Sequence, residues 1–343
     1  MHKILVTGAA GFIGSNFIDR LISETDLDIL ILDNLTYAAN IKNLPSNILL
    51  NGEKDRCQFF HGNIMNEGIV NTLVSQSDYV IHFAAETHVT RSIYDNKHFF
   101  ETDVIGTQCI ANAVLKYKKS IKKFIHISTS EVYGTARTLL MNEEHALNAA
   151  SPYAAAKCGA DRLVYSYWNT YQIPAIIVRP FNSYGPRQHL EKAIPRFITN
   201  AILKEDIVIH GDGLARRDYI FVDDLCTALV QLIKDDNPKL FGEVINIGSG
   251  KDISIVEIAN DILSLMKSSV KIKFIGDRPG QVFRHTADIT KAKNIINWQP
   301  TTSWNEGILK TINWYVNNKE NWIDQLWMRR VPIINALGKR EFH

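Results

Sequence analysis

Short apolar runs alternate with longer segments in which apolar residues recur every three or four positions through the first half of the chain. The short runs have the length of β-strands and are apolar on both faces, whereas the longer segments have the period of amphipathic helices. The runs are KILVTG (3–8), LDILILD (27–33), QFFHG (58–62), DYVIHFAA (78–85), KKFIHIS (122–128) and AIIVRP (175–180), and the main helical segments are 12–23, 98–118 and 152–172. Strands that are buried on both faces and alternate with helices predict an α/β fold with a doubly wound parallel sheet.

The pattern changes after Gly185, where the elements become shorter and more mixed. Helices are predicted at 194–203, 223–234, 254–267 and 303–317, and strands at IVIHG (207–211), RDYIFV (217–222), EVINIG (243–248) and KIKFIG (271–276). We therefore expect a first domain over 1–185, with parts of 207–250 returning to it. Residues 186–343 are expected to form mainly a smaller, interleaved α/β lobe that closes over a substrate, followed by a C-terminal tail.

Composition and charge favour a globular protein over a nucleic-acid-binding, membrane or secreted one. A chain of 343 residues with 45% hydrophobic residues can bury a sizeable core. The formal net charge is +2 and no long block of like charge occurs, so a nucleic-acid partner is not expected. The sequence contains no run of about 18 apolar residues, which is the length that a membrane-spanning helix needs. The start, MHKILVTG, enters a predicted strand at once and leaves no room for a signal peptide, so we expect a cytoplasmic protein.

Possible metal ligands are dispersed along the chain. The four cysteines lie at positions 57, 109, 158 and 226 without a C-x-x-C pair, and the 11 histidines include no H-E-x-x-H motif. We therefore expect buried thiols and no structural or catalytic metal.

A glycine-rich turn joins the first strand to the first helix. Gly8, Gly11 and Gly14 have the spacing G-x-x-G-x-x-G, with Phe12 and Ile13 opening the helix. Glycines at this place allow a tight turn and bring backbone N–H groups and the positive end of the helix dipole close to a pyrophosphate. The strand, turn and helix context therefore predicts a Rossmann-type dinucleotide site.

Polar residues at the ends of later strands extend this prediction. Asp33, followed by Asn34, ends the second strand, where a carboxylate binds ribose hydroxyls and repels a 2′-phosphate, which favours NAD over NADP. After the third strand, Asn63 and its neighbour Ile64 lie where the adenine edge is expected. The fourth strand ends in two small residues that leave room for the cofactor, Ala84 and Ala85.

Candidate catalytic residues surround the next helix start. Tyr153 and Lys157 lie in S-P-Y-A-A-A-K, where a spacing of four places both on one helix face. Beside an ammonium group and an oxidised nicotinamide, the pKa of a phenol falls, so a phenolate can remove the proton of a secondary alcohol. Thr129, at the end of the fifth strand, can hydrogen-bond the same hydroxyl.

Together these segments resemble the extended short-chain dehydrogenase/reductase family, in its nucleotide-sugar epimerase and dehydratase group, over nearly the full length. The motifs are TGAAGFIGSNF, DNLTYAAN, FAAETHVTRSI, STSEVYG, SPYAAAK, RPFNSYGPRQHLEKAIPRFI, GDGLARRDYIFVDD and DRPGQ. Several of them, including the E-K-x-I-P run, most resemble dTDP-glucose 4,6-dehydratases. Such enzymes oxidise C4 of a hexose with bound NAD, eliminate water across C5–C6 and return the hydride to C6.

The resemblance implies roles for individual residues. Tyr153 would be the base at C4, and Lys157 would lower its pKa and anchor the ribose of the cofactor. Thr129 would be the aligning hydroxyl, whereas Glu131 would take the C5 proton. The implied substrate contacts are His88 and Arg91 beside the sugar, Asn182 and Arg217 at the diphosphate, and Arg278 or Arg284 as a second clamp. The helices at 98–118 and 152–172 correspond to the pair that packs across a two-fold axis in this family, so a homodimer is expected.

Three positions depart from the family pattern. Ser130 stands where dTDP-glucose dehydratases carry the aspartate that protonates the departing C6 hydroxyl, and a serine is a poor proton donor. The S-T-S-E pattern resembles GDP-mannose 4,6-dehydratases and some nucleotide-sugar decarboxylases instead. Asp103 replaces the usual asparagine, and Asn63 stands where aspartate is common.

Four functional interpretations follow. A 4,6-dehydratase acting on a nucleotide-diphosphate hexose uses Glu131 directly and fits the surrounding motifs. A nucleotide-hexuronate decarboxylase would need a cation near the sugar carboxylate, for which Arg91 is a candidate. A 4-epimerase needs no carboxylate at the position of Glu131. A non-catalytic NAD-binding sensor would have no need of the tyrosine, lysine and glutamate, all of which are present.

Overall fold

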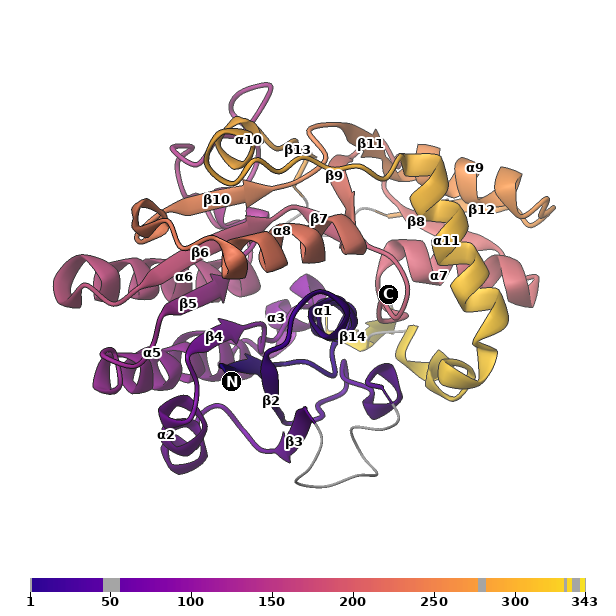
Figure 1. Cartoon of the computed structure of the whole chain (residues 1–343). Helices are drawn as coiled ribbons and strands as arrows, with labels where there is room; N and C mark the ends of the chain where they lie inside the picture. The colour runs from indigo at the N-terminus through magenta and orange to yellow at the C-terminus, as the bar shows by residue number, and fades with distance from the viewer. Residues whose placement is uncertain (1, 46–55, 277–281, 330–331, 335–339, 343) are drawn as a thin grey trace.

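The computed structural model describes residues 2–45, 56–276, 282–329, 332–334 and 340–342. Its largest sheet has the strand order β10-β6-β5-β4-β1-β2-β3, and every neighbouring pair is parallel. The strands are β1 (Lys3–Thr7), β2 (Asp28–Asp33), β3 (Cys57–His61), β4 (Tyr79–His82), β5 (Lys123–Ile127), β6 (Ala175–Pro180) and β10 (Val244–Ile247). The predicted doubly wound sheet is confirmed, with its switch point between β1 and β4, and Figure 1 shows helices on both faces.

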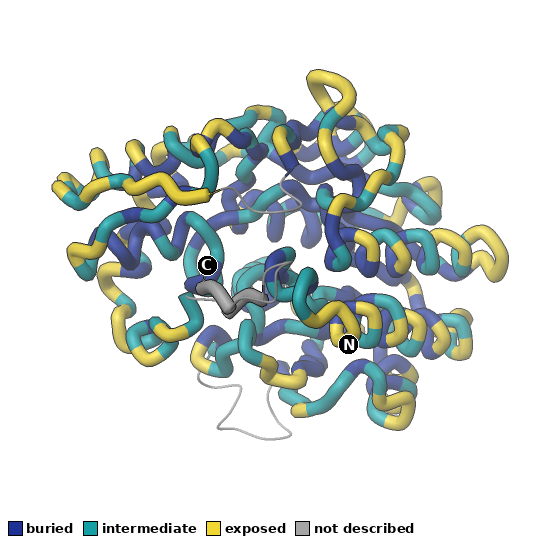
Figure 2. Tube along the Cα trace, turned by 180° about the vertical axis from the view of Figure 1, so that it is seen from behind, coloured by how far each residue is buried: buried dark blue, intermediate teal, exposed yellow. Residues whose placement is uncertain are grey.

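Both faces of the sheet are buried because successive side chains of each strand enter different cores. Ile4 and Val6 of β1 pack with helices α1 (Phe12–Glu24) and α8 (Val222–Lys234). Leu5, between them, packs on the opposite face. The helices on that face are α2 (Glu67–Ser75), α5 (Thr107–Lys116) and α6 (Pro152–Tyr171). This alternation explains why the strands read as continuous apolar runs, and Figure 2 shows the buried residues in the interior of the molecule.

The segment predicted as one helix at 98–118 consists of three consecutive pieces. A short α4 (Lys97–Phe99) leads into a π-helical segment, η4 (Phe100–Gly106), which continues as α5. A π-turn inserts an extra residue and rotates the side chains that follow. The predicted helical segment is therefore present, but the apolar spacing of the sequence does not encode the insertion, so its π-helical part was not expected.

The smaller lobe contains two short sheets. Strand β9 (Arg216–Phe221) pairs with β7 (Asn182–Tyr184), β11 (Asp252–Ser254) and β13 (Arg284–His285), and β8 (Ile207–His210) pairs with β12 (Ile272–Ile275). Its helices are α7 (Ala193–Leu203), α9 (Ile255–Leu265), α10 (Thr290–Ile296) and α11 (Trp304–Asn317). The remaining short elements are α3 (Val89–Tyr94), η1 (Ile41–Asn43), η5 (Ser130–Tyr133) and η6 (Pro238–Leu240). Strand β10 lies in the large sheet, beside β6.

The C-terminal segment contacts both lobes. It begins with η7 (Lys319–Asn321) and η8 (Ile323–Arg329), and ends in a hairpin of β14 (Pro332–Ile334) and β15 (Arg340–Phe342). The Asn40 side-chain amide donates to the Asn321 carbonyl over 3.3 Å. Arg329 donates to Asn200 of α7 over 2.6 Å and pairs with Glu205 over 2.8 Å. In Figure 1 the end of the chain lies between the lobes.

A buried ion pair supports the end of β5. Asp161 on α6 and Arg179 on β6 are 0% and 1% exposed, and two of their N–O pairs are each 2.9 Å apart. Burial alone would raise the pKa of Asp161, but the hydrogen bonds and charge of Arg179 outweigh it and lower the pKa. Ser128 donates to the same carboxylate over 2.7 Å, and Arg179 donates to the Tyr133 hydroxyl over 2.9 Å. The network therefore holds both sides of the segment at 129–131.

Asp161→Asn is expected to lower the free energy of unfolding by about 3 kcal/mol, because it leaves the Arg179 charge buried without its partner. Chemical denaturation measures the change. The exposed pair Lys97–Glu101 supplies the control, since Glu101→Gln should alter stability by less than about 0.5 kcal/mol. A loss for Asp161→Asn as small as that of the control would contradict the prediction.

Candidate active site

A cavity of about 520 Å³ lies outside the carboxyl ends of the parallel strands, between the two lobes. Residues that follow β1 to β6 form one wall, and residues of α7, β8 and β9 form the other. Ligands bind at this place in doubly wound sheets, because the loops diverge on either side of the switch point.

The glycine loop forms the end of the cavity next to α1. Gly8 has a φ of +72°, and a Cβ there would lie 2.6 Å from the Ala84 nitrogen. A Cβ on Gly14 would lie 2.4 Å from the Gly8 carbonyl oxygen. No side chain caps the N-terminus of α1, which begins at Phe12 behind Gly11. The loop thus presents backbone N–H groups and the helix dipole without side chains in the way.

Asp33 sits behind this loop at the end of β2. It is 6% exposed, and its carboxylate accepts the Ala10 N–H over 2.9 Å and the Leu35 N–H over 2.8 Å. Burial raises the pKa of Asp33, and the two backbone hydrogen bonds oppose this. The other predicted cofactor residues also line the cavity: Phe12, Ile13, Asn34, Asn63, Ile64, Ala84 and Ala85. The glycine cradle, the helix end and the acidic residue fit a dinucleotide whose ribose carries free hydroxyls.

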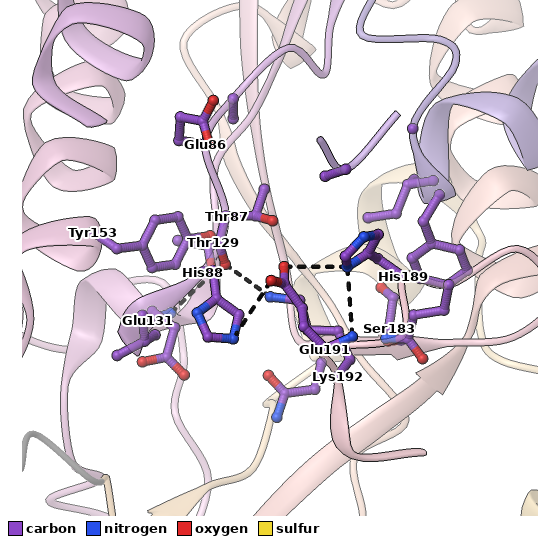
Figure 3. Close-up of a pocket in the computed structure, with 18 of the residues that line it drawn as sticks. Glu86, Thr87, His88, Thr129, Glu131, Tyr153, Ser183, His189, Glu191 and Lys192 are labelled. Carbon is purple, nitrogen blue, oxygen red and sulfur yellow. Dashed lines mark hydrogen bonds and ion pairs between the residues drawn. The ribbon is translucent and has the colours of Figure 1, made fainter. Parts of the chain in front are cut away.

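Four of the five predicted catalytic residues line the same cavity: Thr129, Glu131, Tyr153 and Lys157. The Lys157 ammonium donates to the Ile127 carbonyl over 2.8 Å. A hydrogen bond joins the Tyr153 phenol to the Thr129 hydroxyl, and Figure 3 shows the phenol pointing toward Thr129. The fifth residue, Ser130, is 1% exposed and is not part of the cavity wall.

Burial is the largest influence on the pKa values of Tyr153 and Lys157. It raises the pKa of Tyr153, as do the charges of Asp103 and Glu131, whereas the Thr129 hydrogen bond lowers it. Burial also lowers the pKa of Lys157, against the charges of Asp103 and Asp161. The sequence shows which charges neighbour these groups but not how deeply they are buried, and burial is the largest contribution to both pKa values.

Asp103, on η4, is a buried carboxyl beside this group. It is 1% exposed, and its Oδ1 accepts the Glu86 N–H over 2.8 Å. Its Oδ2 is buried without a hydrogen-bond partner among the described residues. Burial raises the pKa of Asp103 to about 7, although the Lys157 charge opposes the shift. The carboxyl that replaces the usual asparagine therefore changes the charge around Lys157 near neutral pH.

Glu131 faces the cavity from η5. Its backbone N–H donates to the Thr129 hydroxyl over 3.2 Å. One carboxylate oxygen, Oε1, lies 3.8 Å from Nδ1 of His285, which belongs to β13 in the smaller lobe. A single carboxylate of the STSE segment is thus presented to the cavity.

The predicted substrate residues divide into two groups. His88, Asn182 and Arg217 line the cavity. Arg91 is not part of its wall: its guanidinium lies 3.1 Å from Glu191 and 4.2 Å from the centre of the Tyr37 ring. Arg284 is also outside the wall and pairs with Asp252 over 2.7 Å. Arg278 lies outside the described residues.

Polar residues that received no predicted role also line the cavity. Glu191 is 8% exposed, and its Oε2 lies 3.8 Å from His88 Nε2 (Figure 3). Burial would raise the pKa of Glu191, but His189, His88 and Lys192 lower it well below its usual range. The Lys192 ammonium donates to the Thr87 carbonyl over 2.9 Å. The E-K-x-I-P run was the available sequence signal for Glu191 and Lys192.

Two further observations concern metal ions and membranes. Across the described ranges, no cluster of three or more histidine, cysteine or acidic residues could hold a metal ion. Within the same ranges, no helix is both long and apolar enough to cross a membrane.

Comparisons with known proteins agree with this geometry. The GDP-mannose 4,6 dehydratase family model matches residues 5–311. The low-salt glycan biosynthesis protein Agl12 of Haloferax volcanii is 39% identical over 318 residues, covering 92% of this chain and 99% of that protein. The dTDP-glucose 4,6-dehydratase of an Actinoplanes species is 36% identical over 327 residues, covering 93% and 99%.

Solved structures show the same relationship. DesIV, a dTDP-glucose 4,6-dehydratase from Streptomyces venezuelae solved with NAD and TYD bound, matches with a TM-score of 0.87 and 33% identity over 93% of this chain and 98% of that one. A UDP-glucose 4-epimerase of Thermotoga maritima matches with a TM-score of 0.84 and 29% identity, over 92% and 99%. The fold is thus shared with epimerases, whereas the matching family model, the Actinoplanes relative and DesIV are 4,6-dehydratases. The chain belongs to the NAD-dependent nucleotide-sugar 4,6-dehydratases, lyases of the extended short-chain dehydrogenase/reductase family.

Proposed function

We propose that this protein converts a nucleoside-diphosphate hexose into its 4-keto-6-deoxy derivative, with Tyr153, Lys157, Thr129 and Glu131 as the reacting groups. The observation that carries the proposal is the position of Glu131, whose carboxylate lies on the same cavity wall as Tyr153 and Thr129. A 4-epimerase has no use for a base at this place, whereas a dehydratase needs one at C5.

The cofactor would be held by residues of the first lobe. Gly8, Gly11 and Gly14 leave room for the pyrophosphate, and Asp33 accepts hydrogen bonds from ribose hydroxyls. When bound, NAD accepts the hydride from C4 and returns it to C6. We assign cofactor binding to residues 1–185 together with β10, and nucleotide-sugar binding mainly to residues 186–343.

The first proton is removed at C4. The Tyr153 phenolate takes the hydroxyl proton, and Thr129 holds the phenol and the hydroxyl in line. The positive charge of Lys157 on the same helix favours the phenolate. Because burial raises the pKa of Tyr153, these groups must offset that cost.

The second proton is removed at C5, where the new ketone makes the C–H bond acidic. Glu131 takes this proton. Ser130 lies outside the cavity wall, so it does not provide the acid for the C6 hydroxyl. Glu131 therefore returns its proton to the departing hydroxyl and acts as base and then acid.

The substrate would span both lobes. Asn182, Arg217 and Arg196 of α7 are placed to hold the diphosphate, while His88, Glu191 and Lys192 face the sugar. Arg91 is engaged by Glu191 and stacked on Tyr37, so it offers little to a hexuronate carboxylate. This disfavours a decarboxylase. Arg284 is likewise outside the cavity wall and paired with Asp252, so it offers little to the diphosphate, and Arg278 lies outside the described residues.

We also propose a homodimer in the cytoplasm. Phe100 and Ile105 of η4 are 43% and 47% exposed, and Tyr165 of α6 is 36% exposed, so these helices present apolar side chains that a second copy could cover. All four cysteines are thiols, which suits a reducing compartment.

A panel of GDP-, UDP-, CDP- and dTDP-hexoses tests the activity. With the purified protein, one or more members should lose water to give a 4-keto-6-deoxy sugar nucleotide, detected by mass spectrometry. Inversion at C4 alone, or release of carbon dioxide from a hexuronate alone, would contradict the proposal and support the epimerase or the decarboxylase.

A further inference from the structure

His285 lies directly behind Glu131 and has no role in the steps above. It is 1% exposed, and its ring packs edge-on against Phe181, with the ring centres 6.3 Å apart. One nitrogen, Nε2, lies 2.6 Å from the Gly134 carbonyl oxygen. The other, Nδ1, is buried without a hydrogen-bond partner among the described residues and lies 3.8 Å from Glu131 Oε1.

The Gly134 contact fixes the tautomer of His285. A carbonyl oxygen only accepts hydrogen bonds, so Nε2 must carry a proton. In a neutral imidazole, Nδ1 then presents a lone pair toward Glu131. That lone pair repels a carboxylate but accepts a hydrogen bond from a protonated carboxyl.

The surroundings of His285 favour its neutral form. Burial lowers the pKa of His285, the Glu131 charge raises it, Arg217 lowers it, the Gly134 hydrogen bond raises it, and His145 lowers it. These are the charged and polar groups that face the ring from η5, β9 and the segment after η5. An imidazolium at this place would instead stabilise the Glu131 anion and weaken it as a base.

We propose that His285 is a positioning residue that holds the proton on Glu131 between its removal from C5 and its delivery to the C6 hydroxyl. A small rotation of the Glu131 side chain closes the gap, and Nδ1 then accepts a hydrogen bond from the protonated carboxyl. The inference rests on the proposed role of Glu131 and assigns its partner.

The steps balance without another reactant. The C5–H bond breaks, its proton moves to Glu131, and its electron pair enters the enolate formed with the C4 ketone. The C6–O bond then breaks, the hydroxide leaves as water with the proton from Glu131, and a C5–C6 double bond forms. After the hydride returns to C6, C5 takes a proton from Glu131, which has regained one from solvent. In both protonated stages of Glu131, His285 accepts its hydrogen bond.

Two substitutions separate this role from a structural one. His285→Asn places an acceptor near the position of Nδ1 but loses the donor to Gly134. His285→Gln places a donor near the position of Nε2 but loses the acceptor toward Glu131. If His285 acts on Glu131, His285→Gln should slow elimination by roughly 30-fold or more, whereas His285→Asn should stay within roughly 5-fold of the wild type.

The site of the defect gives a second readout. In His285→Gln, C4 oxidation should continue, so reduced cofactor and a 4-keto-hexose nucleotide accumulate, observed by absorbance and mass spectrometry. Loss of the acceptor removes a hydrogen bond that only the protonated carboxyl can donate, so the acid limb of the elimination rate should move down by roughly one pH unit. If the substitution only displaced the neighbouring loop, the reaction would slow but the acid limb of its pH profile would not move.

His145→Asn is the matched control, because His145 is close to His285, has the smallest of the effects named above on it, and among the described residues hydrogen-bonds to Arg137 and Ala146 of its own loop. It should leave both the rate and the pH profile unchanged. The inference is overturned if His285→Asn is the slower variant, or if neither variant moves the acid limb or accumulates reduced cofactor. Absence of a 4-keto-6-deoxy product from the wild type would refute the proposed function itself. Normal turnover by the wild type, together with either of the contradicting results for the His285 variants, would refute only the role of His285.

Discussion

Glu131→Gln is expected to lower the rate of water elimination by roughly 10³-fold while C4 oxidation continues. The amide is nearly the same size as the carboxylate, and the backbone N–H of residue 131 still donates to Thr129. An amide cannot take the C5 proton, however, and the STSE segment contains no second carboxylate. The reaction should therefore stop at the 4-keto-hexose, with the cofactor reduced.

The measurement is a single-turnover experiment that follows reduced cofactor by absorbance and products by mass spectrometry. Glu144→Gln, on an exposed part of the loop beyond η5, is the matched control and should behave as the wild type. Full turnover by Glu131→Gln would mean that another group, such as Glu86 or Glu191 on the cavity wall, removes the C5 proton.

Tyr153→Phe is expected to lower C4 oxidation by a similar factor, roughly 10³-fold, so that neither reduced cofactor nor elimination product forms. The phenol is the group that is hydrogen-bonded to Thr129 within the cavity, and its removal leaves no base at that place. The ring itself remains, and it still packs edge-on against Phe99. Stability should therefore change little.

The distinction between the two variants is the point at which each reaction stops. Tyr153→Phe should leave the substrate unchanged, whereas Glu131→Gln should leave an oxidised intermediate. Tyr165→Phe, on the exposed side of the same helix, serves as the control. Cofactor reduction by Tyr153→Phe at the wild-type rate would exclude Tyr153 as the base.

The fold could be predicted from the sequence because its signals are local. The apolar runs of β1 to β6 and the glycine turn after β1 each lie within a few consecutive residues, and the structure has the strands in a parallel sheet as expected. The π-turn at 100–106 was missed because its extra residue does not disturb the apolar spacing.

The geometry of the candidate site was harder to predict from the sequence, because it depends on contacts between distant segments. No local pattern shows that Arg284 pairs with Asp252, or that Arg91 pairs with Glu191, and these ion pairs decide where each guanidinium points. His285 reads as an isolated histidine in the sequence, and only the folding of the smaller lobe over η5 brings it to Glu131. The assigned roles of the site residues stay predictions.

The C-terminal segment adds a mechanical constraint to the two-lobed cleft. Its hydrogen bond with Asn40 lies beside the cofactor loop, and its contacts with Asn200 and Glu205 lie at the far end of α7. Hinging the lobes apart would break one of these attachments, so we expect the segment to favour the observed arrangement of the cleft. In that arrangement the polar groups around the reacting sugar keep their orientation from one turnover to the next, with little reorganisation energy to supply each time.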